Sequence, residues 1–269
     1  MLEEKNGRVI IDVVFGKKGI EILLDNNDKI NISSSTYSDY YLYKGKELSI
    51  KELGLIKKAN EISKLKQYVT DLLIRKMYSR QEIINKLRKK QANEETINLI
   101  VNDLKQKNLI NDAKYRDILV EEYNYKNYGI NKIKHCLLEK GIEKNLVEQV
   151  KVNIDEELRK ADNSLKEFIK ARNNKSYSKL KESSYNYLIT KGFQIDVVSE
   201  TLSNMSSYAS VENDKSILQK ALEKYVIMHR IDLSDIEAKE KIIKRYKSKG
   251  FSFNLIIECL KEIENGEIC

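Results

Sequence analysis

The chain has 269 residues, contains no proline and no tryptophan, and carries a formal net charge of +8. Charged residues make up 33% and hydrophobic residues 41%, which is polar for a globular protein but outside the range of disordered chains. No apolar run reaches the roughly 18 residues that a membrane-spanning helix needs. Three scattered cysteines suit a reducing compartment, so we expect a cytoplasmic protein without disulfide bonds.

The first 35 residues differ from the rest in carrying short β-branched runs. These runs are Arg8–Phe15, Ile20–Leu24 and Lys29–Ser33. Glycine and lysine at 16–19, and aspartate and asparagine at 25–28, separate them and favour turns. The pattern predicts a three-stranded meander, which is too small to be stable unless it packs on the helices that follow.

From about residue 37 the apolar residues recur every three or four positions, which is typical of amphipathic helices. Ser49 and Glu52 fit a capping box, in which each side chain accepts a hydrogen bond from the backbone N–H of the other. A long helix is predicted from Ile50 to Met77, with a break near Gly54. Two further serine–glutamate pairs with the same spacing predict helix starts: Ser79–Glu82 and Ser234–Glu237.

One segment recurs four times along the chain, at intervals of 50, 51 and 58 residues. Each copy has lysine followed by glycine, or by glutamine in the first copy, and a β-branched residue six positions later. A glycine at the end of a helix takes up the left-handed conformation without a steric penalty from Cβ. In the last three copies an apolar residue follows the glycine. The copies are Lys90-Gln91 with Ile97, Lys140-Gly141 with Val147, Lys191-Gly192 with Val198, and Lys249-Gly250 with Ile256.

These intervals leave room for three short helices in each copy, and consecutive copies can bury a shared core. The predicted fold is therefore mainly α: an elongated, curved array of tandem three-helix repeats with a small N-terminal β-meander. The predicted divisions are 1–48 for the meander and connecting segment, 49–112 for the first repeat with its lead-in helix, 113–158 for the second repeat, 159–210 for the third, and 211–269 for a degenerate fourth.

Arrangements of residues that would support catalysis are missing from the sequence. The two histidines, His135 and His229, lack metal-ligand spacing, and no phosphate-binding loop or nucleophile motif is present. The acidic segment at 25–28 lacks the glycine and the closing glutamate of a calcium loop. The sequence therefore predicts no enzymatic activity, no cofactor and no metal. Tyrosines at 37–43 and 123–128 have rings that could stack on bases, but we favour packing against the core.

Positive charge is concentrated in the second quarter of the chain. Residues 61–150 carry 18 basic and 13 acidic groups, whereas residues 212–269 carry 11 of each. Between Arg75 and Lys90 there are seven basic residues and one acidic residue, Glu82. Such a stripe attracts polyanions or an acidic protein surface. From charge alone, a solvated lysine-rich helix face explains the pattern about equally well.

The segment from Tyr68 to Val150 resembles the RecX family, bacterial regulatory proteins that restrain the recombinase RecA. The segment at 44–48, with the strands before it, is similar to the N-terminal part of longer family members. The sequence departs from the family where Gln91 and Asn108 replace glycines. The residues that carry the resemblance are Arg75, Ser79, Glu82, Ile83, Lys86, Leu87, Asn108–Asp112 and Tyr115 in the first unit, Lys126, Tyr128, Gly129 and Lys140–Ile142 in the second, and Lys191–Phe193 in the third.

The resemblance implies a non-enzymatic protein that lies in the groove of RecA filaments on single-stranded DNA and lowers recombination and the SOS response. The expected partner is the RecA nucleoprotein filament, with weak contact to single- or double-stranded DNA, no membrane and a monomeric chain. We expect many weak contacts, since each exposed charge contributes only about 0.2–1 kcal/mol. The proposed contact residues are surface cations: Arg75, Arg80, Lys86, Arg88, Lys89, Lys90 and Lys126.

Two other functions stay open at this point. A basic helical protein that coats DNA is the main alternative, although a net charge of only +8 and a neutral C-terminal quarter favour protein contacts. A hydrolase in the tyrosine-rich region is a third and weaker hypothesis, because no catalytic motif supports it.

Ile83, Ile84 and Leu87 share the helix face opposite the cations and are predicted to lie in the core. Substituting Leu87→Ala is then expected to lower the free energy of unfolding by about 2–5 kcal/mol, because it leaves a cavity. Urea denaturation of the full chain measures this change. A cost near zero would mean that the two faces of the helix are reversed.

Overall fold

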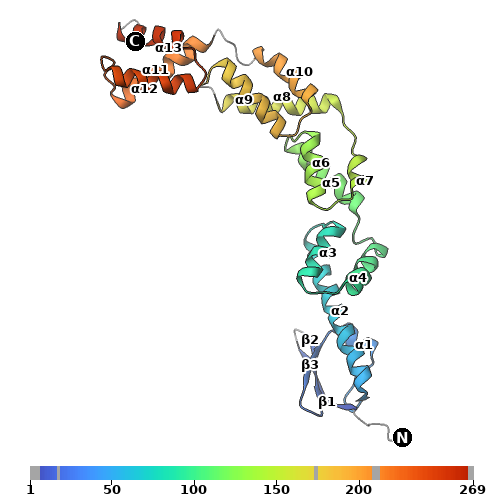
Figure 1. The fold of residues 1–269 in the computed structure, drawn as a ribbon. Coiled ribbons are helices and arrows are strands. Elements are labelled where there is room, and N and C mark those ends of the chain that lie inside the picture. The colour runs from blue at the N-terminus through green and yellow to red at the C-terminus, as the bar shows by residue number, and fades with distance from the viewer. Residues whose placement is uncertain (1–6, 17–18, 173–174, 208–212, 266–269) are drawn as a thin grey trace. The chain divides into compact units, whose positions relative to one another are not determined.

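The computed structural model describes residues 7–16, 19–172, 175–207 and 213–265. The chain divides into two compact units (Figure 1). The first consists of Met1–Tyr115 with Lys140–Ile142, and the second of Arg116–Glu139 with Glu143–Cys269. Within the described residues the secondary structure comprises four strands, thirteen α-helices and one short 3-10 helix.

The first unit begins with an antiparallel sheet of strand order β3-β2-β1-β4. Its inward side chains, Ile10, Ile22 and Ile32 among them, are buried. The predicted meander is confirmed, but the sequence analysis missed a two-residue fourth strand and a six-residue helix. The elements are β1 (Arg8–Gly16), β2 (Gly19–Leu24), β3 (Lys29–Ile32), α1 (Ser34–Asp39) and β4 (Glu47–Leu48).

A buried asparagine attaches this sheet to the long helix α2 (Ile50–Arg75). The Asn60 side chain accepts a hydrogen bond from the backbone N–H of Ser33 at 2.9 Å and donates one to the carbonyl of Asn31 at 2.8 Å. Ile56, one turn earlier, joins the apolar core of the sheet. The sheet therefore gains its stability from the following helix, as its small size requires.

Helix α2 packs with α3 (Arg80–Lys89) and α4 (Glu94–Gln106) around a core that includes Leu87, Ile97 and Ile100. The capping boxes at Ser49 and Ser79 are both formed, as predicted. Helix α2 continues through Gly54 without the expected break. The remaining helices of the first two groups are α5 (Asp112–Tyr125), α6 (Ile130–Glu139) and α7 (Lys144–Glu148).

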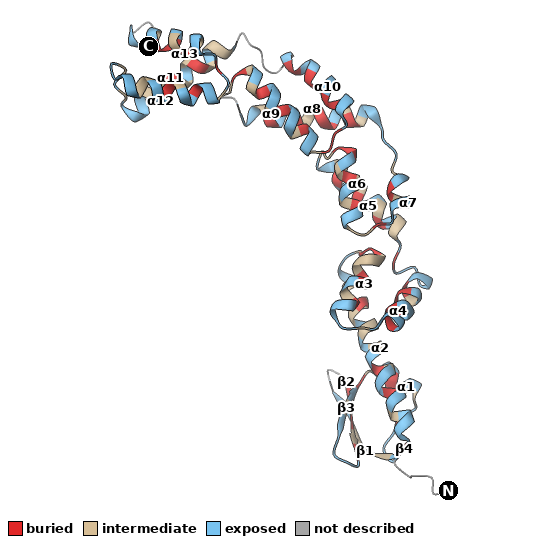
Figure 2. Ribbon diagram, in the orientation of Figure 1, coloured by how far each residue is buried: buried red, intermediate tan, exposed pale blue. Residues whose placement is uncertain are grey.

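Two further groups of helices in the second unit have separate apolar cores, which appear as buried stripes in Figure 2. Phe193 and Val198 lie in one core, and Phe251 and Ile256 in the other, so the recurring apolar positions are buried as predicted. The groups are α8 (Ile154–Lys170), α9 (Tyr177–Thr190) and α10 (Ile195–Ser203) with η1 (Asn204–Ser207), then α11 (Asp214–His229), α12 (Ile236–Ser248) and α13 (Phe253–Glu264).

The predicted fold is thus confirmed: it is mainly helical, with a small N-terminal sheet followed in sequence by tandem groups of three helices. The residue divisions remain a proposal, and the helix bounds favour moving the boundary at 158 to 153, because α8 begins at Ile154. The boundary at 112 falls on the first residue of α5. The boundary at 210 lies outside the described residues.

One predicted helix start is wrong. Helix α12 begins after Asp235, whose side chain accepts the hydrogen bond from the backbone N–H of Glu237 at 2.9 Å. Ser234 instead donates its hydroxyl to Asp232 at 2.7 Å. The capping box predicted at Ser234 fails because two nearby carboxylates, stronger acceptors than a hydroxyl, satisfy these donors.

The glycine of each lysine–glycine turn has a positive φ, as the helix-end interpretation predicts: 76° at Gly141, 88° at Gly192 and 92° at Gly250. Gln91 has a φ of 61° and makes the same turn. A side chain in the left-handed region carries some strain, but Gln91 is exposed, so its side chain has room.

The turns also have a second role, which the sequence analysis missed. Each of the last three docks on the start of an earlier helix, and we call these contacts joints. In the first unit the Ser79 hydroxyl donates to the carbonyl of Lys140. In the second unit the backbone N–H of Gly129 donates to the backbone carbonyl of Lys191 at 2.9 Å. The backbone N–H of Ser176 donates to the backbone carbonyl of Lys249 at 3.2 Å.

Each joint also contains a carboxylate that accepts a hydrogen bond from the first N–H of the same helix. The first N–H groups of a helix have no partner within it and attract negative charge. Asp112 accepts from Arg80 at 2.8 Å, Glu157 from Ile130 at 3.0 Å, and Asp214 from Tyr177 at 2.8 Å. The three joints therefore share one design.

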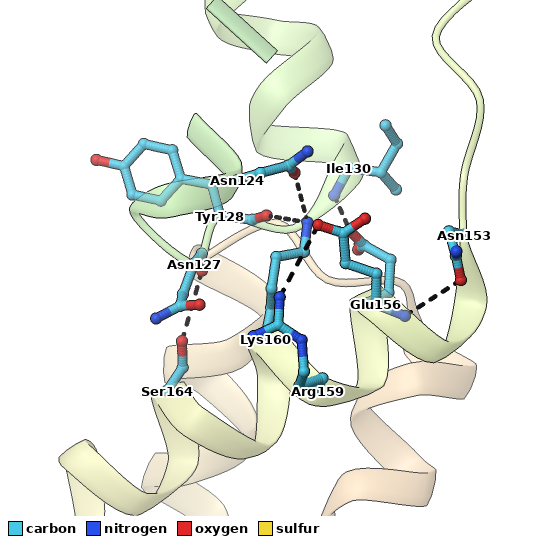
Figure 3. Close-up of polar contacts among 10 residues, drawn as sticks. Asn124, Asn127, Tyr128, Ile130, Asn153, Glu156, Arg159, Lys160 and Ser164 are labelled. Atoms are coloured by element: carbon cyan, nitrogen blue, oxygen red, sulfur yellow. Dashed lines mark hydrogen bonds and ion pairs between the residues drawn. The ribbon is translucent and has the colours of Figure 1, made fainter. Parts of the chain in front are cut away.

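The joint at Ile130 contains a buried ion pair (Figure 3). The Lys160 Nζ lies 2.5 Å from Glu157 Oε1, and both side chains are at least 95% buried. The same ammonium donates to Asn124 Oδ1 at 2.8 Å and to the carbonyl of Tyr128 at 2.9 Å. A lysine ammonium has three protons, and here all three have acceptors. The Lys160 ammonium therefore holds the joint together, and none of its protons is left for contact with a ligand.

Glycine 129 is expected to tolerate no larger residue. A Cβ at this position would overlap backbone atoms of Gly192 and Phe193, which cannot move aside as a side chain could. We predict that Gly129→Ala lowers the free energy of unfolding by about 1–3 kcal/mol. Gly54→Ala is the matched control: its Cβ meets open space in α2, so about 0.5–1 kcal/mol of stabilisation is expected. Equal effects in urea denaturation would contradict this account of the joint.

Removing one partner of the buried pair is expected to destabilise the protein strongly. We predict that Lys160→Met lowers the free energy of unfolding by about 3–5 kcal/mol, because Glu157 is left buried and unpaired. The double variant Lys160→Met/Glu157→Gln is expected to recover part of this loss, since the amide oxygen can still accept from Ile130. The exposed pair Lys166–Asp162 in the same helix provides the control, and Lys166→Met should cost about 0–1 kcal/mol. Similar losses for both lysine variants would show that the burial of Lys160 is unimportant.

Candidate partner-binding surface

Six of the seven proposed contact cations lie in the first unit, on or beside α3. Lys126 follows α5 and lies in the second unit, so it is not part of the same local cluster. The six are Arg75 at the end of α2, Arg80 at the start of α3, Lys86, Arg88 and Lys89 within α3, and Lys90 at its C-cap.

Helix α3 keeps its apolar and cationic faces apart. Ile83 and Leu87 are fully buried and Ile84 nearly so, whereas Arg88 and Lys89 are exposed. The predicted assignment of the two faces is confirmed. The cations therefore stand on a helix that is anchored by its core face.

Two of the proposed cations have carboxylate partners of their own. The Arg88 guanidinium donates to both Glu94 oxygens, at 2.9 and 3.3 Å, and this contact lowers the pKa of the Glu94 carboxyl. Lys126 Nζ lies 2.5 Å from Glu122 Oε1, one turn away. Both residues therefore present less positive charge to a partner than the sequence suggests.

Tyrosine rings lie against three other cations of the cluster. The ammonium groups of Lys76 and Lys86 lie 4.7 and 4.8 Å from the centre of the Tyr78 ring. That of Lys90 lies 5.0 Å from the centre of the Tyr68 ring. Such cation–π contacts are attractive and do not neutralise the charge. The sequence analysis did not select Lys76 or either tyrosine for the site, although lysine and tyrosine two residues apart at 76 and 78 were a usable signal.

We call the uncompensated part of this cluster the α2–α3 cationic surface. Arg75 and Lys89 are exposed, and neither forms an ion pair with any residue in the described part of the chain. The surface consists of Arg75, Lys76, Lys86, Lys89 and Lys90.

A hollow of about 410 Å³ continues this surface between α2 and the turn after α3. Lys64 and Lys90 contribute cations to its lining, and Glu61 contributes an acid. Lys58, on the same side, reaches Glu95 at 3.5 Å. Positive charge therefore extends from α3 along the side of α2.

Within the described residues, no three histidine, cysteine or acidic side chains come together as a metal site would require. Burial raises the pKa of the Cys259 thiol to about 11, so it stays protonated and unreactive at neutral pH. No helix in the described ranges is long and apolar enough to cross a membrane. The arrangement is one that attracts anionic groups by charge.

Comparison with known proteins gives consistent matches. The chain is 27% identical over 246 residues, 88% of its length, to "Regulatory protein RecX" of Lactococcus lactis subsp. lactis (strain IL1403), of which it covers 90%. It is 29% identical over 252 residues, 92% of its length, to the protein of the same name from Listeria monocytogenes serotype 4b (strain F2365), of which it covers 93%. No family model matches.

Solved structures support the fold. The "Crystal structure of regulatory protein RecX" matches with a TM-score of 0.59 and 22% identity, over 72% of this chain and 98% of that one. The structure of RecX from Lactobacillus salivarius matches with a TM-score of 0.51 and 26% identity, over 55% of this chain and 98% of that one. The RecX resemblance carried by the residues at 68–150 is thus confirmed, and this chain is similar in sequence and fold to proteins named RecX.

Proposed function

We propose that the chain is a non-enzymatic regulator that binds RecA filaments on single-stranded DNA and lowers RecA activity. The observation that carries this proposal is the similarity, over 88–92% of the chain, to proteins named Regulatory protein RecX. Restraint of RecA is the activity that the family resemblance implies. The matches cover at least 90% of these relatives, so the similarity is not limited to one repeat.

The α2–α3 cationic surface is the proposed contact region in the first unit. In the described part of the chain its charges have no carboxylate partner, and its helices are anchored by buried apolar faces, so binding needs little rearrangement. We expect Arg88 and Lys126 to contribute less to partner binding, because they already form ion pairs with Glu94 and Glu122. Arg80 also contributes less, since its side chain is half-buried.

Coating of naked DNA is the alternative, and it is favoured by the same lysines and by the neighbouring tyrosines. Contact with phosphates makes affinity fall steeply with salt, because bound counterions are released. A filament-specific protein would instead act below one copy per RecA at salt concentrations where it does not bind naked DNA. The two functions therefore differ in stoichiometry and in salt dependence.

The experiment is to measure the DNA-dependent ATPase rate of RecA against increasing amounts of the full chain at two salt concentrations. Binding of the chain to naked single-stranded DNA is measured alongside. We expect inhibition below one chain per RecA at the higher salt. Inhibition that only follows DNA coverage would support the coating alternative, and no inhibition at all would refute the proposal.

Charge reversal tests the surface itself. We predict that Lys89→Glu/Lys90→Glu raises the half-inhibitory concentration about tenfold, because two uncompensated attractions become repulsions, each worth up to about 1 kcal/mol. The control, Lys105→Glu/Lys114→Glu, changes the charge equally at exposed sites of the first unit and should stay within about twofold. The melting temperatures of both variants show whether folding is affected. Equal losses of inhibition in both variants would remove the α2–α3 surface from the contact region.

A further inference from the structure

A large cavity lies in the second unit, far in sequence from the α2–α3 surface. Its volume is about 680 Å³, within the range of pockets that hold small ligands. Residues that precede and begin α9 line one side, and α11 and α12 line the others. The function proposed above does not make use of this cavity.

The charged residues of the lining are mostly cations. Lys220 and Lys224 lie one turn apart on α11, and Arg245 and Lys249 lie one turn apart on α12 or at its C-cap. Lys175 adds a fifth cation just before α9. Among the described residues of the lining, the carboxylate is that of Asp214, which already accepts the backbone N–H of Tyr177. Two pairs of cations therefore face one space, and they outnumber the acids of the described lining.

This cluster cannot be recognised from the net charge of residues 212–269, which is zero. Several of their acidic groups are held by cations outside the cavity: Lys215 pairs with Glu258 and Glu262, and Lys239 pairs with Glu264. Those acids are thus unavailable to the lining. Burial and the nearby Arg245 charge lower the pKa of Lys249, as expected where like charges gather.

Aromatic and apolar atoms complete the cavity. The Arg245 guanidinium lies 4.6 Å from the centre of the Tyr225 ring, and the His229 ring lies 4.5 Å from the same ring. Met228, which is 63% exposed, stands at the lining beside them. A ligand that fits here needs a compact, multiply charged group and a planar or apolar part.

We propose that this cavity binds a phosphate-bearing ligand of nucleotide size. A phosphate group concentrates charge and many acceptor atoms in one place, and arginine and lysine recognise it well. The attached base would meet the His229 and Met228 side of the cavity. An acidic peptide fits less well, because its charges are spread along an extended chain, whereas this space is a compact hollow. The source of the phosphate is either a free nucleotide or one nucleotide of a single strand.

The test uses the full chain with methyl-labelled methionine and observes the four methionine signals by NMR. The variant Met228→Leu assigns the signal of the cavity methionine by its disappearance. Met205, which is buried in the core of α8–α10 and does not line the cavity, is the internal reference. The probes are dTMP, an eight-residue oligothymidylate, inorganic phosphate and a hexaglutamate peptide. No RecA is present, so the result is independent of the function proposed above.

We expect dTMP or the oligothymidylate to shift the Met228 signal saturably while the Met205 signal stays unchanged. Binding of dTMP identifies a free nucleotide as a sufficient ligand, and binding of the oligothymidylate alone identifies a strand. The variant Lys220→Gln/Lys224→Gln should weaken binding about tenfold, because it removes two charge-assisted contacts. The matched variant Lys244→Gln/Lys261→Gln removes equal charge at exposed positions outside the lining and should change binding less than about twofold.

Four outcomes would overturn the proposal: no Met228 shift with either nucleotide probe, equal weakening in the two double variants, stronger binding of hexaglutamate than of both nucleotides, or equal binding of inorganic phosphate and dTMP. The last would show that the base makes no contact. Circular dichroism melting of each variant confirms that the comparison is made on folded protein.

Discussion

The structure depends on the need of every helix start for hydrogen-bond acceptors. The N–H groups at the beginning of a helix have no partners within it, and burying them unpaired is costly. At three joints a lysine carbonyl and a carboxylate from later in the chain lie at a helix start. Packing of one group of helices on another is thus tied to hydrogen bonds that the helices require in any case.

This requirement explains why glycine recurs. A left-handed turn alone can be made by other residues, as Gln91 and Asn108 show with φ of 61° and 53°. At Gly192, by contrast, a Cβ would overlap the backbone and side chain of Lys132. The glycine therefore serves two purposes, and the close approach is the more demanding. The replacement of glycine by glutamine in the first copy is consistent with its exposed position.

Local patterns predicted most of the fold, because strand alternation, capping residues and the recurring lysine–glycine turn all act over a few residues. The two-residue strand β4 was missed because so short an element has no period. The joints were also missed, since their hydrogen bonds connect residues 27 or more positions apart in the chain. One signal was available at Lys160: it falls in the apolar stripe of α8 with Ala161 and Leu165, where a charged residue indicates a buried partner.

The candidate surface was harder to predict than the fold, since net charge along a sequence does not show which charges meet. Arg88 and Glu94 are joined around a turn, and this pair removes a cation from the stripe. The opposite happens in the last group of helices, where pairing elsewhere leaves a positive cavity in a segment of zero net charge. Counting charges along the sequence therefore overestimated the positive charge of the α2–α3 surface and missed the positive cavity in the last group of helices.

The exposed start of α12 has a consequence for how such an array grows by duplication. All three of α3, α9 and α12 begin at a residue whose side chain caps the helix, but the serines of α3 and α9 are buried under a later turn, whereas the aspartate of α12 is exposed. A duplicated group inserted before α11 would find the complementary partner at both of its ends. One added after α13 would meet a charged, exposed aspartate where the other joints have a buried serine or glycine, so lengthening of the array is favoured in its interior.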